Sequence, residues 1–262
     1  MNHAPRKRFG QNFLKDDLIL QRMVAAIHPK PPEHLVEIGP GLGALTQGLL
    51  KEGVRLDAIE LDRDLVTHLQ RRFQGVEGFR LHSADALRFD FTPLMGESRL
   101  RVVGNLPYNI STPLIFHLLE QGPVIADMHF MLQREVVDRL CAEAGEGAYG
   151  RLSIMTRYYC RAIKLFEVPP ESFDPPPKVM SAIVRLVPHE RPPVEVDPKR
   201  LGRLVTAAFS QRRKTLRNAL KGWCEVGALE TAGIDPGSRP ETLSLQDYAR
   251  ILEVARPADQ EA

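Results

Sequence analysis

Four residues, Asn105, Leu106, Pro107 and Tyr108, form a segment that follows the mostly apolar run 100–103. Such a short, β-branched run predicts a buried strand, and open α/β sheets bind ligands outside the carboxyl ends of their strands. The Asn105 side-chain oxygen and the Leu106 carbonyl can both accept hydrogen bonds from one NH2 group. Pro107 fixes its own φ, and Tyr108 offers a ring for stacking. The segment predicts a receptor for an unpaired adenine, although a strand-ending turn would use the same residue types.

A glycine-rich turn, residues 39–43, comes directly after another expected strand. Gly39 and Gly41 let the backbone approach a ligand closely, and the helix that follows presents free N–H groups. The next expected strand, residues 56–61, carries Glu60 about twenty residues beyond the turn, where a carboxylate can accept both hydroxyls of a ribose. The combination predicts a cofactor that contains a nucleoside. The glycine spacing also fits a dinucleotide, so an NAD-dependent oxidoreductase remains an alternative.

Asp85 follows a third expected strand, residues 79–83, and so falls on the same edge of the sheet. There it could hold the amine of a cofactor adenine, although an isolated Asp is more often a helix N-cap. Further strands are expected at 127–132, 162–168 and 180–187, with helices between them. This alternation predicts an α/β fold with seven strands.

The amino-terminal segment mixes the cations Arg6, Lys7 and Arg8 with nearby aromatic residues, before an amphipathic helix expected over residues 16–27. Asp16 is suited to be the N-cap of that helix. A disordered tail would carry fewer apolar residues, so we expect an arm that packs back onto the protein. A tail that merely covers the helix is the alternative.

Composition narrows the class of protein. The 262 residues are 43% hydrophobic, enough for a large domain with a smaller one, and 35 basic residues nearly balance 33 acidic ones. Any nucleic-acid binding must therefore come from local patches. Three widely spaced cysteines and eight scattered histidines predict neither disulfides nor a metal site. No apolar run approaches the roughly 18 residues of a membrane span, and we expect a cytoplasmic monomer.

The carboxyl-terminal part changes character after a proline-rich linker, residues 188–198, and its patterning becomes helical. Residues 199–221 contain eight Lys or Arg and no acidic residue. Runs of charge are usually solvated faces, but this concentration favours contact with an RNA backbone. The cations expected to bind RNA here are Arg212, Arg213, Lys214, Arg217 and Lys221.

The order of these features resembles the class I S-adenosylmethionine-dependent methyltransferases that modify an adenine amine, and more closely the ribosomal RNA adenine dimethyltransferase family. The resemblance covers nearly the whole chain. It is carried by motifs at residues 10–14, 37–43, 105–108, 133–136, 149–153, 173–179 and 209–216. It implies a Rossmann-like, mostly parallel seven-stranded sheet in a domain of residues 1–190, and a small helical domain of residues 191–262 that contacts RNA.

The resemblance also implies roles for individual residues. The residues that would bind S-adenosylmethionine are Asn12, Leu14, Gly39, Gly41, Glu60, Asp85 and Asn105. The target base would lie against Asn105, Leu106, Pro107 and Tyr108, with Phe173 on its other face. The arm cations Arg6, Lys7 and Arg8 would join the carboxyl-terminal cations in binding RNA.

The activity implied is dimethylation of N6 on adjacent adenosines near the 3′ end of small-subunit ribosomal RNA, coupled to subunit biogenesis and requiring no metal. The partner would be the small ribosomal subunit or its precursor. Two alternatives share most of the features. One is the related family that methylates large-subunit ribosomal RNA and confers macrolide resistance, and the other is a ribosome assembly factor in which methylation is secondary.

Overall fold

The computed structural model describes residues 11–211 and 213–255, which form two compact units. The larger unit contains residues 11–137 and 163–188, and the smaller contains 138–162 and 189–255. The segment 138–162 thus belongs to the smaller unit, whereas the boundary expected from the sequence places it in the first domain. Division into independently folding domains near residue 190 stays a prediction.

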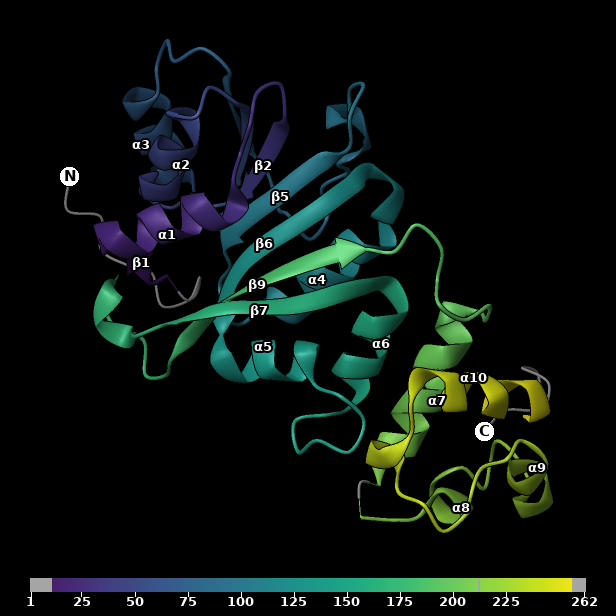
Figure 1. Ribbon diagram of the computed structural model, residues 1–262. Coiled ribbons are helices and arrows are strands. Elements are labelled where there is room, and N and C mark those ends of the chain that lie inside the picture. Colours follow the sequence, from purple (N-terminus) through teal and green to yellow (C-terminus); the bar gives the residue numbers. More distant parts are fainter. Residues whose placement is uncertain (1–10, 212, 256–262) are drawn as a thin grey trace. The chain divides into compact units, whose positions relative to one another are not determined.

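A single seven-stranded sheet organises the larger unit (Figure 1). Its strands, in the order in which they lie side by side, are β4 (Phe79–Ser83), β3 (Arg55–Glu60), β2 (His34–Ile38), β5 (Leu100–Asn105), β6 (Ile125–Gln133), β9 (Ser181–Pro188) and β7 (Cys160–Val168). The pairs from β4 through β6 are parallel, and β9 runs antiparallel to β6. The predicted α/β fold is confirmed.

The chain reverses its direction of progress across the sheet between β2 and β5. From β2 it continues outward to β3 and β4, and it then returns to place β5 on the other side of β2. The carboxyl ends of β2 and β5 therefore diverge into connections on opposite sides of the sheet. Such a topological switch point leaves a crevice for a ligand.

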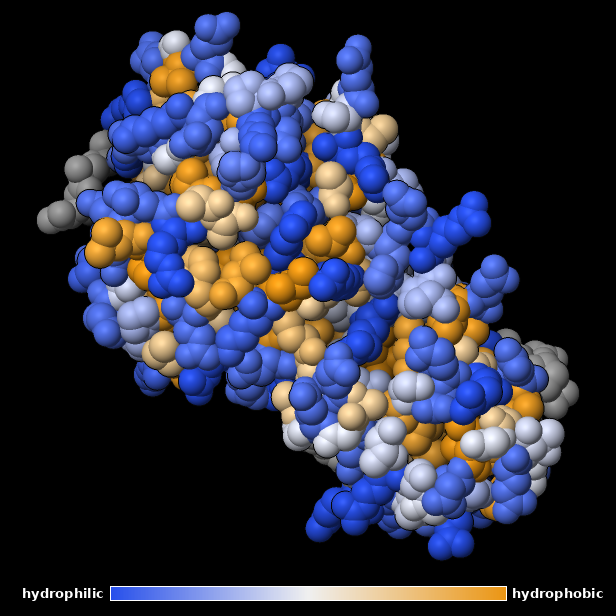
Figure 2. Space-filling view, viewed as in Figure 1, coloured by the Kyte–Doolittle hydropathy of each residue, from blue (hydrophilic) through white to orange (hydrophobic). Residues whose placement is uncertain are grey.

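Helices cover both faces of the sheet, which explains why every residue of β2 is buried. On one face α1 (Asp17–Ile27) and α2 (Ala44–Leu50) pack over a core that includes Met23, Leu49 and Val103. On the other face α4 (Ser111–Glu120) lies behind β6 and β9 in Figure 1. The remaining helices of this unit are α3 (Arg63–Arg72) and the start of α5 (Arg134–Cys141). Most of the visible surface of this unit is polar, but hydrophobic residues reach it along α1 and β7 (Figure 2).

The described part of the amino-terminal arm is tied down at several points. A short strand β1 (Phe13–Leu14) pairs antiparallel with β8 (Phe173–Asp174), and the Lys15 N–H donates to the Ser172 carbonyl at 2.9 Å. Asp16 caps α1 by accepting from two backbone N–H groups of its first turn, as predicted. For residues 11–15, the expectation that the arm packs back onto the protein is confirmed.

The smaller unit is helical, as the sequence predicts. Its helices are α6 (Arg151–Tyr159), α7 (Pro198–Ser210), α8 (Leu216–Ala219), α9 (Val226–Thr231) and α10 (Leu245–Val254). Two buried tyrosines hold it together: Tyr149 donates its hydroxyl to the Leu243 carbonyl at 2.8 Å, and Tyr248 donates to the Pro240 carbonyl at 2.9 Å. The first bond attaches the segment before α6 to the segment before α10, and the second holds α10 to residue Pro240.

The described residues also bear on membrane-spanning helices and on metal sites. Within residues 11–211 and 213–255, no helix combines the length and the apolar character that crossing a membrane requires. The same residues contain no cluster of three or more His, Cys, Asp or Glu side chains that could ligate a metal.

Gly104 on β5 leaves no room for a side chain next to the end of β2, and this generates the first prediction. A Cβ at this position would lie 2.4 Å from the Ile38 carbonyl oxygen, a backbone atom. We expect Gly104→Ala to force the strands apart and to lower the free energy of unfolding by about 2–3 kcal/mol. Urea denaturation measures this change. Gly122→Ala is the matched control, because no atom lies within 4 Å of its added Cβ; equal stability of the two variants would contradict the prediction.

Candidate functional site

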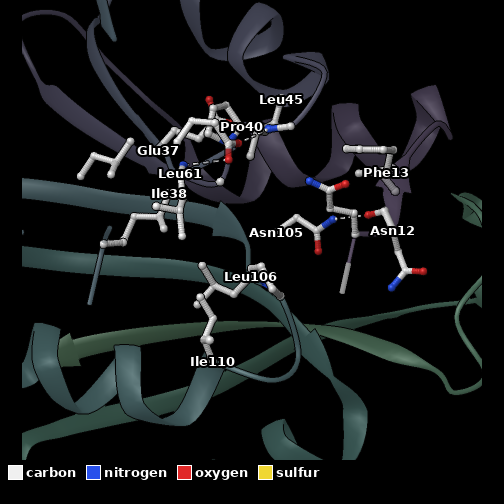
Figure 3. A pocket seen from close by; sticks show the side chains of 18 of the residues that line it. Asn12, Phe13, Glu37, Ile38, Pro40, Leu45, Leu61, Asn105, Leu106 and Ile110 are labelled. Carbon is white, nitrogen blue, oxygen red and sulfur yellow. Dashed lines mark hydrogen bonds between the residues drawn. The ribbon is translucent and has the colours of Figure 1, made fainter. Parts of the chain in front are cut away.

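A cavity of about 310 Å³ lies at the carboxyl ends of β2, β3 and β5, at the switch point. Its lining comes from segments far apart in the sequence: the arm, the glycine turn, the ends of β3 and β4, and the segment after β5. Figure 3 shows Asn12 and Phe13 of the arm on one side of the cavity and Asn105 and Leu106 facing it. Of the residues predicted to bind cofactor, the cavity is lined by Asn12, Leu14, Gly39, Gly41, Glu60, Asp85 and Asn105.

The glycine turn is shaped by positive φ angles and by contact with the arm. Gly41 has φ +58°, and a Cβ there would lie 3.0 Å from the Phe13 ring. A side chain at this position would therefore be strained and would also push the arm away. The glycine serves two purposes, because it makes the turn and it lets the aromatic residue close over it.

Glu60, at the end of β3, is 7% exposed and lines the cavity. One carboxylate oxygen accepts from the N–H groups of Leu61 and Asp62, both at 2.9 Å, and the other accepts from the Gly41 N–H at 3.4 Å. Burial raises the pKa of Glu60, and these N–H groups offset only part of that rise. The carboxylate is thus held in place by the turn that it faces.

Glu37 is a second buried carboxyl group in the cavity, and sequence reasoning gave it no role. It lies on β2 and accepts a hydrogen bond from the Thr46 hydroxyl at 2.6 Å. Burial raises its pKa to about 7; the Thr46 bond opposes the rise, and the nearby charge of Glu60 adds to it. Its only signal in the sequence is a charged residue inside an otherwise apolar strand.

Asp85 lies at the start of a turn, not at the start of a helix, so the N-cap alternative is wrong, while a contact with the cofactor adenine stays a prediction. One carboxylate oxygen accepts from the Leu87 N–H at 3.0 Å, which is the local turn contact expected of such an Asp. The residue is only partly buried, and it also lines the cavity. Together with Glu37 and Glu60 it makes the cavity acidic.

Asn105 connects the arm to the strand end. Its side-chain Nδ2 donates to the Asn12 carbonyl at 2.9 Å (Figure 3). Because the amide nitrogen is committed to the arm, the oxygen is the atom of this group that can accept from a ligand. The sequence predicted an acceptor at this position but not the backbone bond that orients it.

The rest of the 105–108 segment is both a turn and part of the cavity lining. The Pro107 carbonyl accepts from the Ile110 N–H at 3.2 Å, so the segment does form a strand-ending turn, and its role as a receptor for adenine stays a prediction. Leu106 is buried, and its N–H donates to the Met131 carbonyl at 3.2 Å, which fixes its backbone to β6. Leu106, Pro107 and Tyr108 all line the cavity.

Phe173 is not where the sequence placed it. Its side chain is 1% exposed and packs in the core cluster beneath α1, and its backbone pairs with Leu14 in the β1–β8 ribbon. It is not among the residues that line the cavity. The expectation that its ring faces the base is therefore not met in this structure, because the residue is packed into the hydrophobic core.

Leu61 is a lining residue that the sequence analysis missed. It follows Glu60 directly, yet its side chain is 51% exposed beside the cavity. An exposed leucine next to a carboxylate suited to ribose offers an apolar surface for the flat face of a base. The signal available in the sequence was its position, one residue past the end of a buried strand.

The four predicted RNA-binding cations that the structure describes are not among the residues that line this cavity. Arg213, Lys214, Arg217 and Lys221 are exposed on the smaller unit, around the start of α8. The other four, Arg6, Lys7, Arg8 and Arg212, lie outside the described residues.

Comparison with known proteins identifies the family. The model of the family described as ribosomal RNA adenine dimethylase matches residues 2–256. The chain belongs to this family. A ribosomal RNA small subunit methyltransferase A from Methylococcus capsulatus is 60% identical, over 98% of this chain and 100% of that protein. The protein of the same name from Pseudomonas aeruginosa is 59% identical, over 95% and 94%.

Solved structures agree with the fold of a ribosomal RNA adenine dimethylase. A dimethyladenosine transferase from Plasmodium falciparum superposes with a TM-score of 0.78 at 27% identity, covering 92% of this chain and 96% of that one. The 23S rRNA methyltransferase ErmE gives 0.73 at 25% identity, covering 93% and 99%. The predicted Rossmann-like methyltransferase fold is confirmed.

The raised pKa of Glu37 generates the second prediction. A carboxyl whose folded-state pKa exceeds its unfolded value contributes stability at low pH, and that contribution is lost as pH rises through the folded pKa. Since burial raises the pKa of Glu37 from 4.5 to about 7, we expect Glu37→Gln to gain roughly 2–3 kcal/mol relative to the parent chain between pH 5 and pH 8. Urea denaturation across this range measures the difference in free energy of unfolding between the variant and the parent chain. The exposed Glu52→Gln is the control. A difference for Glu37→Gln that does not grow with pH would contradict the raised pKa of Glu37.

Proposed function

We propose that this member of the ribosomal RNA adenine dimethylase family uses S-adenosylmethionine to dimethylate N6 of adjacent adenosines in small-subunit ribosomal RNA. The observation that carries the proposal is the meeting, in one cavity, of an acidic nucleoside-type site and the Asn105 acceptor. The first half suits a cofactor and the second suits a base amine. Family membership and the high identity to small subunit methyltransferase A proteins support the same reading.

The residues of the cavity fit S-adenosylmethionine by charge and by shape. Its sulfonium and amino groups are cationic, and Glu37, Glu60 and Asp85 supply three carboxyl groups around the cavity. Glu60 is placed to accept the ribose hydroxyls, and Leu61 presents an apolar side chain for the adenine. An acidic cavity would disfavour the pyrophosphate of a dinucleotide, so the charge argues against the NAD alternative.

When bound, S-adenosylmethionine would supply a methyl group on a positively charged sulfur, and its transfer to adenine N6 would leave S-adenosylhomocysteine. The chain's own task is to hold N6 in line. The Asn105 oxygen and the Leu106 carbonyl can accept from the amine, which fixes its direction and favours its pyramidal form. In each transfer the proton displaced from N6 would pass to solvent water, and two such transfers would yield the dimethylated base. Orientation and electrostatics carry the catalysis, without a protein nucleophile.

The target adenine must leave its helix to reach this cavity. A stacked base hides its amine, and extrusion costs a few kcal/mol, least for an unpaired nucleotide. Tyr108 offers the ring against which the extruded base would stack. The exposed cations around α8 would supply the contacts to the phosphate backbone.

Small-subunit RNA is favoured over large-subunit RNA by the relatives. The chain is 60% identical to a protein named for the small subunit and 25% identical to the 23S rRNA methyltransferase ErmE, which has a similar fold. The fold alone therefore does not separate the two substrates. A cytoplasmic location, a monomeric state and a role in subunit biogenesis stay predictions.

The deciding experiment incubates the protein with labelled S-adenosylmethionine and small ribosomal subunits that lack the modification, followed by nucleoside analysis of the RNA. We expect N6,N6-dimethyladenosine in small-subunit RNA and none in large subunits treated in the same way. In this assay Asn105→Ala should lower the transfer rate by at least about 100-fold, because both the acceptor and its bond to the arm are lost. A variant with normal turnover would remove Asn105 from the mechanism.

Cofactor binding and RNA binding should separate by mutation. Glu60→Ala should weaken S-adenosylmethionine binding at least about tenfold, because it removes a charge-assisted acceptor for ribose, and should leave RNA affinity unchanged. Arg213→Ala combined with Lys214→Ala should do the reverse and should reduce the slope of log affinity against log salt by about 1.5, since each lost phosphate contact contributes roughly 0.7–0.9. Calorimetry and a salt titration measure the two effects. Equal losses in both assays for either variant would contradict this division of roles.

A further inference from the structure

Tyr108 is held at its hydroxyl end as well as at its backbone. The phenol oxygen lies 2.7 Å from the hydroxyl of Ser181, and the two groups share a hydrogen bond. Ser181 is the first residue of β9 and is fully buried. Tyr108 itself lines the cavity and is only partly buried. The bond therefore joins a ring at the cavity surface to a fixed point inside the protein.

Ser181 lies in the same set of paired strands as Asn105. Ser181 pairs with Gln133 at the end of β6, and Asn105 at the end of β5 pairs with Met131 on the same strand. Next to Ser181, the Met180 carbonyl accepts from the Arg134 N–H at 2.9 Å, which holds the start of β9 to the chain after β6. The ring of Tyr108 and the amide of Asn105 are thus both positioned by the paired strands β5, β6 and β9.

The backbone end of Tyr108 is fixed independently. Its carbonyl accepts from the Ser111 hydroxyl at 3.2 Å, and Ser111 is buried in the first turn of α4. With the backbone held there and the phenol held at Ser181, rotation about the side-chain torsions is restricted at both ends. Removing either hydroxyl of the Tyr108–Ser181 pair would release one end of the ring.

We propose that Ser181 is a positioning residue for methyl transfer, which sets the plane of the Tyr108 ring and through it the position of the stacked base. The inference rests on the proposed function. Stacking fixes the distance between the base and the ring but not the lateral position of the base. A ring that can tilt would therefore let N6 move away from the line of attack. Ser181 has no need to touch the base, because it acts through Tyr108.

A neutral phenol suits this role. Burial raises the pKa of Tyr108, and the Ser181 bond opposes only part of that rise. The hydroxyl pair therefore keeps its proton across the neutral range, and the positioning effect should not vary with pH between about 6 and 9. A general acid or base at this place would show such a variation.

The test measures single-turnover methyl transfer to unmodified small subunits with both substrates saturating. Ser181→Ala should lower the rate by roughly tenfold, less than the about 100-fold that a 1 Å misplacement can cost, with cofactor affinity unchanged. Tyr108→Phe, which keeps the ring, should lose a similar factor. The double variant should be no slower than either single one, because both remove the same bond. Ser181→Thr, which keeps a hydroxyl, should recover most of the rate.

Two outcomes overturn the proposal: an unchanged rate for Ser181→Ala, or losses in the two single variants that multiply in the double. Ser153→Ala is the matched control, because it removes a buried serine hydroxyl that donates to the Arg139 carbonyl in the smaller unit. It should lower the melting temperature without slowing transfer. An equal slowing by this control would show that general destabilisation accounts for the effect.

A spectroscopic readout separates this inference from the proposed function. Incorporation of 3-fluorotyrosine labels the five tyrosines, and the resonance missing from Tyr108→Phe identifies that ring. Ser181→Ala should shift or broaden this resonance and leave the other four in place. If the parent chain transfers no methyl group, the proposed function fails whatever the spectrum shows. If transfer is normal and the resonance does not respond to Ser181→Ala, the positioning role fails alone.

Discussion

The close approach of β5 to β2 is the constraint on which the site depends. At Gly104 the strand backbone lies so near the Ile38 carbonyl that a Cβ would have no room. This contact sits one residue before Asn105 and one residue before the glycine turn, so it brings the two halves of the cavity together. Because the two strands are parallel neighbours at a topological switch point, their following segments turn apart and leave the space between them open.

The arm completes the cavity from a distant part of the sequence. Its Asn12 carbonyl receives the Asn105 amide, its Phe13 packs on Gly41, and its short strand pairs with residues 173–174. One segment therefore touches Asn105, the glycine turn and the connection before β9. Each contact is small, but all of them join residues far apart in the sequence. The contacts that hold the arm in place are therefore the same ones that shape the cavity. This explains how a segment outside the sheet can decide which atom of Asn105 faces a ligand.

The sequence predicted those features that depend on local pattern. Apolar runs and the residues that end them predict the positions of the strands. They also predict the Asp16 cap and the placement of Glu60 and Asn105 at strand ends. It failed where a partner far along the chain decides the outcome. Phe173 belongs to a motif that suggests an exposed ring, yet it is buried among core residues from α1, β6 and β9. The packing of segment 138–162 with the carboxyl-terminal helices also depends on distant partners, and the domain boundary near residue 190 stays a prediction.

The buried carboxyl group of Glu37 lowers the stability of the protein when the cavity holds no ligand. A carboxyl buried inside a strand, beside the second carboxyl Glu60, costs free energy in the absence of a ligand, and its raised pKa expresses that cost. Replacement by an apolar residue would suit the fold better. The group becomes favourable only when a positive charge enters the cavity, since an opposite charge stabilises the ionised form. A cationic ligand in this cavity would therefore offset part of the cost of burying Glu37.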